Sequence, residues 1–141
     1  MRHRNHRTRL NRTSAHRLSL MKNLAKAFFT YEKIVTTVPK AKALRGFVEP
    51  LITLAKSDDL SRRRRVIQLL GIRFNPLTSK QKKMVKAGNL APYNDDRKIV
   101  DKLFKEIGPK FKVRPGGYTR IVKTKSRSGD SADCCIIESV E

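Results

Sequence analysis

Arginine side chains give this chain its strongest candidate chemistry, the binding of phosphate groups. Six arginines lie within the first 17 residues, and four more are consecutive at Arg62–Arg65. The planar guanidinium group presents paired N–H donors that match phosphate oxygens. Because successive helical residues turn by about 100°, these four cannot share one face, and we expect one to lie along the edge of the core. A merely solvated charge run is the alternative, and no acids at helical spacing support it.

Histidine and cysteine residues do not form a convincing metal site. All three histidines fall within the first 16 residues, and His3 and His6 have a spacing that metal ligands use. Cys134 and Cys135 are adjacent, whereas paired cysteine ligands are usually about two to four residues apart. We expect no metal and no cofactor, with the histidines contacting phosphate or base. Adjacent cysteines also provide no disulfide framework, which favours a reducing cytosol.

Catalytic arrangements are absent from the sequence as well. A nucleophilic side chain needs a base beside it on an ordered scaffold, and every histidine lies in an N-terminal segment without a core of its own. The paired carboxylates Asp58-Asp59 and Asp95-Asp96 stand at predicted helix starts, where capping explains them. No glycine-rich loop of the dinucleotide or P-loop type occurs. We therefore expect a protein that is not an enzyme, and an RNA-processing enzyme is the least favoured function.

The net charge of +21 indicates a polyanionic partner. Residues 1–26 hold eight Lys or Arg and no acid, 61–98 hold eleven against two, and 99–130 hold nine against three, while 27–60 are nearly balanced at five against four. A solvated surface would mix the two signs. An anionic membrane is disfavoured because no apolar run approaches about 18 residues and the chain has no Trp. Nucleic acid remains, although charge alone does not distinguish RNA from DNA.

Residues 1–13 form a basic N-terminal arm. Their apolar side chains are Met1 and Leu10, so this segment cannot build a core. It is disordered alone or ordered by a partner, and folded RNA commonly orders Arg-rich segments. Residues 1–26 also have the composition of a mitochondrial transit peptide. We favour an arm because the segment leads directly into a helix with core-like spacing.

The apolar pattern predicts the elements that position these basic residues. A first helix, capped at Thr13 or Ser14, is followed by a short β-branched strand at 33–38 and a second helix at 39–56 that begins with a proline. The first helix has residues at spacings of three and four that predict one buried stripe: Leu20, Met21, Leu24, Phe28 and Tyr31.

Further helices are predicted between residues 57 and 109. Ser57 or Asp58 caps a third helix that contains the arginine run and ends near Gly71. Within the lysine-rich 71–94, Thr78 and Gln81 have capping-box spacing, and Gly88 closes a short helix. Another helix begins after Asn94, and Gly108-Pro109 is expected to stop it.

The C-terminal part predicts a β-hairpin. Its strands are 118–125 and 134–140, with Tyr118 and Val122 on one face of the first strand and Ile121 on the other. The order helix, strand, helices, hairpin predicts one α+β domain at 14–141, preceded by the arm at 1–13.

Six separated motifs resemble one known family. They are MRHR at 1–4, LNRTSAHR at 10–17, TTVPKAKALR at 36–45, EPLITLAK at 49–56, KLFKEIGPKF at 102–111 and GGYTRIVK at 116–123. Together they are similar to the seventeenth protein of the bacterial large ribosomal subunit. The resemblance implies a small mixed three-stranded sheet packed by helices. It also implies binding to 23S-type ribosomal RNA near the polypeptide exit tunnel, beside neighbouring large-subunit proteins. Catalysis and a homo-oligomer are not expected, and the location is the cytoplasmic ribosome, with an organellar ribosome less favoured.

The resemblance carries RNA contacts over to the basic residues of its motifs: Arg2, Arg4, Arg12, His16, Arg17, Lys40, Lys42, Arg45, Lys110 and Arg120. The remaining candidates come from the arm, the first helix, the arginine run and the C-terminal half: His3, Arg7, Arg9, Lys22, Arg62, Arg63, Arg64, Arg65, Arg114 and Lys123. Gly116 and Gly117 would let the backbone approach a phosphate closely, but a plain tight turn explains them at least as well.

Two segments depart from the family's usual pattern. Residues 71–94 are additional to its short form and lysine-rich, so we expect a surface excursion that reaches further RNA or a neighbouring protein. Residues 5–8 replace a stretch that normally contains Lys and Gly, which leaves the arm's path open there. The alternative function is a free RNA chaperone or nucleic-acid-compacting protein.

Overall fold

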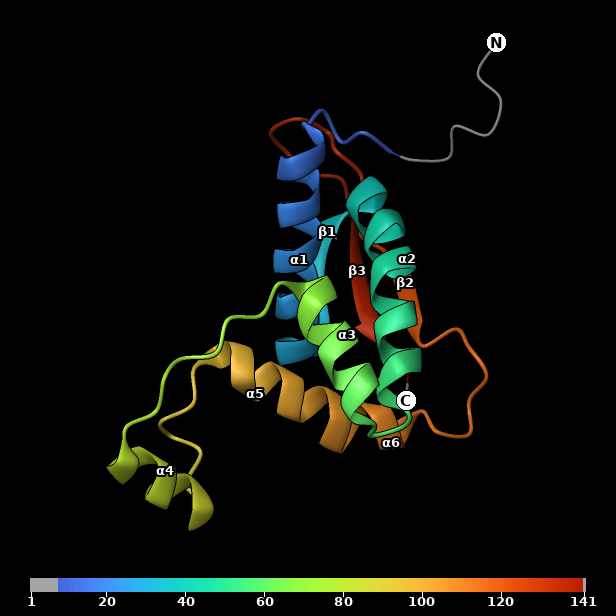
Figure 1. Cartoon of the computed structure of the whole chain (residues 1–141). Coiled ribbons are helices and arrows are strands. Elements are labelled where there is room, and N and C mark those ends of the chain that lie inside the picture. The colour runs from blue at the N-terminus through green and yellow to red at the C-terminus, as the bar shows by residue number, and fades with distance from the viewer. Residues whose placement is uncertain (1–7, 141) are drawn as a thin grey trace.

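The computed structural model describes residues 8–140, in which three strands form one sheet (Figure 1). The strands β1 (Lys33–Thr37), β2 (Thr119–Lys123) and β3 (Cys134–Ser139) have the order β1-β3-β2. Both neighbouring pairs are antiparallel, which confirms the predicted hairpin but makes the expected mixed sheet wrong. The reason is the central place of β3, which runs opposite to both neighbours. Its residue Ile137 pairs with Ile34 on one side and Ile121 on the other.

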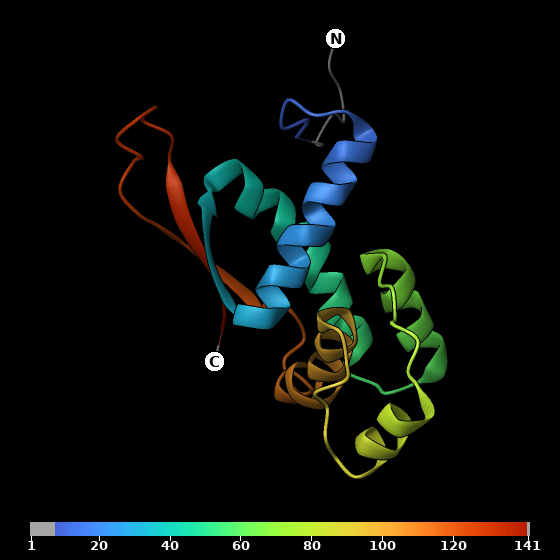
Figure 2. The same ribbon diagram turned by 90° about the vertical axis from the view of Figure 1, so that its left-hand side faces the viewer.

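Two long helices cover one face of the sheet, and a third packs on their outer side (Figure 2). α1 (Ser14–Tyr31) and α2 (Val38–Ala55) contact the sheet, whereas α3 (Leu60–Leu70) contacts α1 and α2. The core lies between these layers. The predicted α+β class and element order are therefore confirmed. No helix within residues 8–140 combines the length and the apolar character that a membrane span requires.

The buried face of α1 differs from the predicted stripe. Tyr31 is 72% exposed, while Ala25 and Phe29 are fully buried. Tyr31 ends the helix, and Glu32 takes a left-handed conformation with φ 57°, so no further turn covers the tyrosine. Ala25 is too small to mark a stripe in sequence, but it allows α1 to pack closely.

The helix after Asn94 does not stop at Gly108-Pro109. α5 (Asp95–Lys102) starts as predicted, with the Asn94 side chain accepting the Arg97 N–H. The chain then continues as the short π-helix η1 (Leu103–Ile107) and the single helical turn α6 (Gly108–Lys110). The Gly108 N–H bonds back to the Leu103 carbonyl. Proline is tolerated in the following first turn of α6, where its missing donor costs little.

Gly108 is also the point where this helical path meets α2. The glycine is buried, and a Cβ added there would overlap the carbonyl oxygen of Ala55. The close approach of two backbones therefore requires glycine at this position, although its φ is an ordinary helical −56°.

The faces of the hairpin also differ from the prediction. Tyr118 is buried, but it precedes β2, so the alternation of the strand does not extend to it. Within β2, Ile121 packs against the core while Val122 is 42% exposed. The expected sharing of one face by Tyr118 and Val122 is therefore wrong.

Residues 71–94 leave the body and return to it, with a short helix at the tip (Figure 1). Gly71 ends α3 in a left-handed conformation with φ 62°. α4 (Ser79–Lys86) starts at the predicted capping box of Thr78 and Gln81, and Gly88 follows it with φ 90°. α4 has no buried residue.

Candidate nucleic-acid interface

The described end of the arm turns over the start of α1. Arg9 and Arg12 are exposed, as is His16 on the first turn of the helix. The Arg17 guanidinium donates to the Arg9 carbonyl at 3.5 Å, which draws the arm towards α1. These four candidates therefore surround one helix start. Four others lie outside the described residues: Arg2, His3, Arg4 and Arg7.

A groove separates this end of α1 from the first half of α2. It is lined by residues of the arm and both helices, including Thr8, Leu10, Arg17, Leu18, Lys42, Gly46 and Phe47. Arg17 and Lys42 supply a cation from each wall, and Phe47 contributes an aromatic surface. Nothing lies within 4 Å of the position that a Cβ on Gly46 would occupy. Such a combination suits a sugar-phosphate chain with an unstacked base.

The first turns of α2 extend this basic surface. Lys42 and Arg45 are exposed and three residues apart, which places them on neighbouring parts of one helix face. Lys40 is half-buried. None of the three forms an ion pair within residues 8–140.

The arginine run on α3 divides its roles. Arg63 is the one along the core edge, as predicted for one of the four: its guanidinium lies 4.8 Å from the centre of the Phe104 ring. It also donates from Nε and Nη2 to the two carboxylate oxygens of Asp58. Arg62 is half-buried, Arg64 is exposed, and Arg65 is exposed with a 3.1 Å hydrogen bond to Gln68.

Asp58 therefore serves Arg63 and does not cap α3. The N-cap residue is Asp59, so the predicted capping by Ser57 or Asp58 is wrong. The Asp59 carboxylate accepts the Ser61 hydroxyl and bonds to no backbone N–H of the first turn. Asp58 reaches Arg63 from outside the helix, which is why no acid at helical spacing foretold the pair. The bond from Arg63 lowers the pKa of Asp58 and, reciprocally, raises the pKa of Arg63.

A second groove runs between α2, α3 and the turn before β2. Arg65 and Gly116 both line it. Lys56 fixes the turn: its ammonium donates to the Arg114 carbonyl and lies 4.8 Å from the centre of the Tyr118 ring. Hydrogen bonds from Lys56 and Thr53 lower the pKa of the Tyr118 hydroxyl.

Gly116 and Gly117 keep both of their proposed explanations. Gly117 has φ 64°, which a tight turn requires of glycine. Both glycines are exposed and have nothing within 4 Å of an added Cβ, so their backbone is also open to a phosphate.

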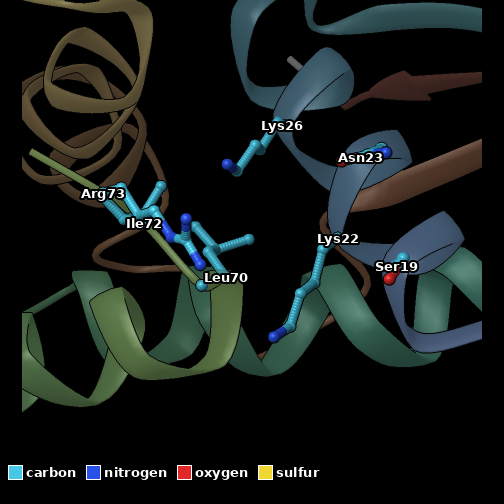
Figure 3. A pocket seen from close by; sticks show the side chains of 8 residues that line it. Ser19, Lys22, Asn23, Lys26, Leu70, Ile72 and Arg73 are labelled. Carbon is cyan, nitrogen blue, oxygen red and sulfur yellow. The ribbon is translucent and has the colours of Figure 1, made fainter. Parts of the chain in front are cut away.

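Lys22 lies in a pocket between α1 and the end of α3 (Figure 3). An added Cβ on Gly71 would be 3.0 Å from the Lys22 ammonium, which places that charge beside the carbonyl end of α3, where cations are favoured. Sequence analysis overlooked two other basic residues of this pocket, Lys26 and Arg73, because neither falls in a charge run.

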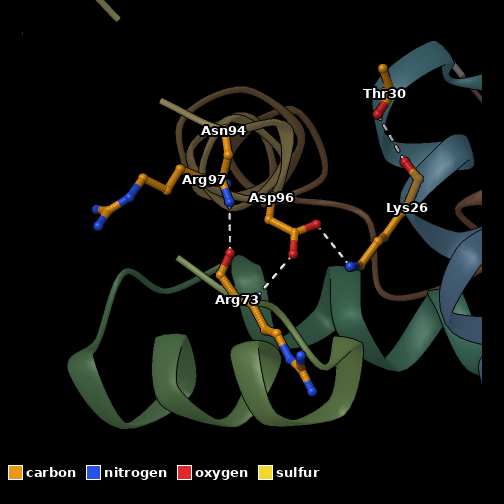
Figure 4. Close-up of polar contacts among 6 residues, drawn as sticks. All are labelled: Lys26, Thr30, Arg73, Asn94, Asp96 and Arg97. Carbon is orange, nitrogen blue, oxygen red and sulfur yellow. Dashed lines mark hydrogen bonds and ion pairs between the residues drawn. The ribbon is translucent and has the colours of Figure 1, made fainter. Parts of the chain in front are cut away.

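Lys26 forms a partly buried ion pair with Asp96 (Figure 4). Its ammonium lies 2.8 Å from one oxygen of Asp96, and the other oxygen accepts the Arg73 N–H at 2.9 Å. Burial acts to raise the pKa of Asp96, but the bonds from Arg73 and Lys26 outweigh it and lower the pKa.

The candidates of the C-terminal half are spread over separate elements. Lys110 lies 3.9 Å from a carboxylate oxygen of Glu32. Arg114 is exposed and bonds to the Gly116 carbonyl at 3.3 Å. Arg120 and Lys123 are exposed on β2, the edge strand away from β1.

Ion pairing separates these candidates from the other basic residues. Of the candidates within residues 8–140, only Arg63 and Lys110 have a carboxylate partner. The remaining ion pairs use other bases: Lys26, Lys33, Lys98, Lys102, Lys105 and Arg127. The arm end, the start of α1 and the start of α2 thus form a surface of uncompensated positive charge.

Metal ligands do not gather in the part of the chain that the structure describes, where no group of three or more His, Cys, Asp or Glu occurs. Both cysteines are free thiols. Cys135 is fully buried in β3, and this burial raises its pKa.

Comparison with known proteins gives one consistent result. The family model described as ribosomal protein L17 matches residues 20–140. The large ribosomal subunit protein bL17 of Protochlamydia amoebophila (strain UWE25) is 53% identical over 138 residues, covering 98% of this chain and 97% of that protein. The proteins of the same name from Chlamydia felis and Chlamydia pneumoniae are 48% and 47% identical with the same coverage.

Proposed function

The chain belongs to the ribosomal protein L17 family and is a structural protein of the large ribosomal subunit, and we propose that it binds 23S-type ribosomal RNA through the arm, α1 and α2. The proposed contacts are the candidate residues given above, with Arg9, Arg12, Arg17, Lys42 and Arg45 at their centre. Binding neutralises this surface and stabilises the folded RNA. The family consists of ribosomal proteins, which agrees with the expectation that the chain is not an enzyme.

The observation that carries this proposal is the uncompensated charge. Basic residues around the groove lack acidic partners among residues 8–140, whereas those on α5, η1 and β1 have them. Unpaired cations at this density repel one another. Binding to a phosphate backbone removes that repulsion, because the basic side chains neutralise phosphates and release the counterions of the RNA.

The family's place in the particle extends the proposal. We place the protein near the polypeptide exit tunnel of the cytoplasmic ribosome, beside neighbouring large-subunit proteins, with residues 1–13 seated between RNA helices. Crosslinking within intact large subunits tests this: crosslinks from Arg12 to RNA far from the tunnel would contradict it.

RNA binding itself is tested by a charge-matched pair of variants. Replacing Arg17, Lys42 and Arg45 by Gln should reduce the log–log salt slope of binding to large-subunit RNA by about 2 to 3, at 0.7–0.9 per phosphate contact. The control replaces the ion-paired Lys33, Lys98 and Lys105 by Gln. Equal losses in both variants would mean that net charge, and not this surface, determines binding.

A free RNA chaperone is the competing function. A stoichiometric subunit component stays with the large subunit through high-salt washing, whereas a chaperone elutes as its phosphate contacts are screened. Elution of this protein at moderate salt would favour the chaperone.

A further inference from the structure

The excursion at 71–94 is fastened at its base by a polar ladder. The Asn94 side chain donates to the Arg73 carbonyl at 2.7 Å (Figure 4). The Asn75 side chain donates to the Pro92 carbonyl at 2.9 Å and accepts the Asn94 N–H at 3.4 Å. The outgoing and returning segments are therefore joined side by side, close to where they meet α5.

Arg97 completes this base from the first turn of α5. Its guanidinium lies 4.6 Å from the centre of the Phe74 ring and 5.2 Å from that of Tyr93. It also donates to Asn75, to the side-chain oxygen at 3.2 Å and to the carbonyl at 2.9 Å. One arginine thus binds an aromatic ring on each segment and fixes the direction in which the excursion leaves the body.

The tip that this base carries is basic on one side. Lys80, Lys82, Lys83 and Lys86 of α4 lie within an arc of about 160°, and Met84 is about 40° beyond Lys80. Residues 71–94 contain no Asp or Glu, and none of these lysines forms an ion pair within residues 8–140.

These features make α4 unfavourable as an isolated surface. Like charges three or four residues apart destabilise a helix, a helix this short is marginal in water, and α4 buries no side chain against the body. A polyanion would turn the repulsion among its lysines into attraction. A partner protein that binds a helix in a groove would need an apolar face on α4. However, Val85 is half-buried, and Met84 is the single exposed apolar side chain of this helix.

We infer that α4 is a second RNA-binding element, whose lysine face binds the phosphate backbone of large-subunit RNA away from the arm and groove, with Arg97 as its positioning residue. The inference rests on the proposed function, since it takes the same RNA as ligand. It adds a separate contact that the base of the excursion holds ready, so less ordering is needed on binding.

The test uses the full chain and transcribed large-subunit RNA over a salt series. Replacing Lys82, Lys83 and Lys86 by Gln, a residue of similar helix propensity, should lower the salt slope by about 2 to 3. The control variant with Gln at 33, 98 and 105 removes the same charge and should lower it less.

Arg97→Lys tests the positioning role because it keeps the charge but loses the planar fork. It should weaken RNA binding several-fold in the natural chain and cause no further loss in the triple-Gln variant of α4. Equal losses in both backgrounds would indicate a general structural defect and overturn this role.

The outcomes separate the inference from the proposed function. Tight binding by the natural chain with an unchanged slope for the α4 variant overturns the inference alone. An unchanged slope together with poorer incorporation into large subunits means that α4 contacts a protein, which also overturns it. Failure of the natural chain to bind this RNA overturns both.

Discussion

Replacing either of two helical glycines by alanine should have opposite effects on stability. Gly46 lies inside α2 and Gly108 in the helical path that follows η1. Alanine is favoured over glycine inside a helix by about 0.5–1 kcal/mol. At Gly46 nothing opposes this gain, because an added Cβ meets no atom within 4 Å.

At Gly108 the added Cβ overlaps the backbone carbonyl of Ala55, which no rotamer change relieves. Overpacking of a dense interior costs about 1–3 kcal/mol, and a backbone obstacle places this case near the upper end. After subtracting the helix gain, we expect Gly108→Ala to lower the free energy of unfolding by about 2 kcal/mol.

Thermal unfolding followed by circular dichroism measures both changes. For a domain of this size, about 1 kcal/mol shifts Tm by roughly 2–5 °C, so Gly108→Ala should lower Tm and Gly46→Ala should raise it by a few degrees. A shift of both variants in the same direction would refute the assignment of Gly108 to a close backbone contact.

Three further perturbations have definite expected outcomes. The pKa of Asp96 is lowered in the folded state. The ionised carboxylate therefore stabilises the protein at pH above its unfolded pKa of about 4, and this stabilisation is lost as pH falls through the folded pKa. Asp96→Asn should flatten the acid side of a plot of Tm against pH, and an unaltered curve would contradict this. Phe29→Ala should lower the free energy of unfolding in urea by about 3–5 kcal/mol, while Tyr31→Ala, at a 72% exposed site, should change it by less than about 0.5 kcal/mol. Similar decreases for both variants would mean that Tyr31 is part of the core. Removing residues 1–12 should weaken subunit assembly and leave Tm of the isolated protein nearly unchanged, and a large fall in Tm would count against an arm that acts through RNA.

Local signals in the sequence predicted most elements because their physical causes are local. The capping box at Thr78 and Gln81 and the cap at Asn94 need only neighbouring residues, and both occur in the structure. The helix end predicted at Gly108-Pro109 is wrong because the π-helix η1 and a non-local contact of Gly108 with α2 determine the course of the chain there. The buried face of α1 was only partly predicted, since Ala25 gains its place from the helix that packs on it.

The basic surface shows the same division. Composition located the uncompensated charge of the arm, which depends only on which residues are present. It did not separate Arg63 from Arg64, because the partner of Arg63 reaches it from outside the helix. Arg97 was missed as well, since its contact with Phe74 joins residues that are distant in sequence and meet only in the fold, whereas its neighbour Tyr93 alone did not indicate the role.

The central position of β3 has a consequence for the order of synthesis. β3, which joins β1 to β2, is the last of the three strands to be synthesised. It pairs with a strand from the N-terminal part of the chain, as the pairing of Glu138 with Lys33 shows. A chain broken off before residue 134 leaves β1 and β2 with unpaired edges, which are prone to aggregate. Closure of the sheet thus distinguishes finished molecules from fragments, even though a fragment already carries the arm, α1 and α2.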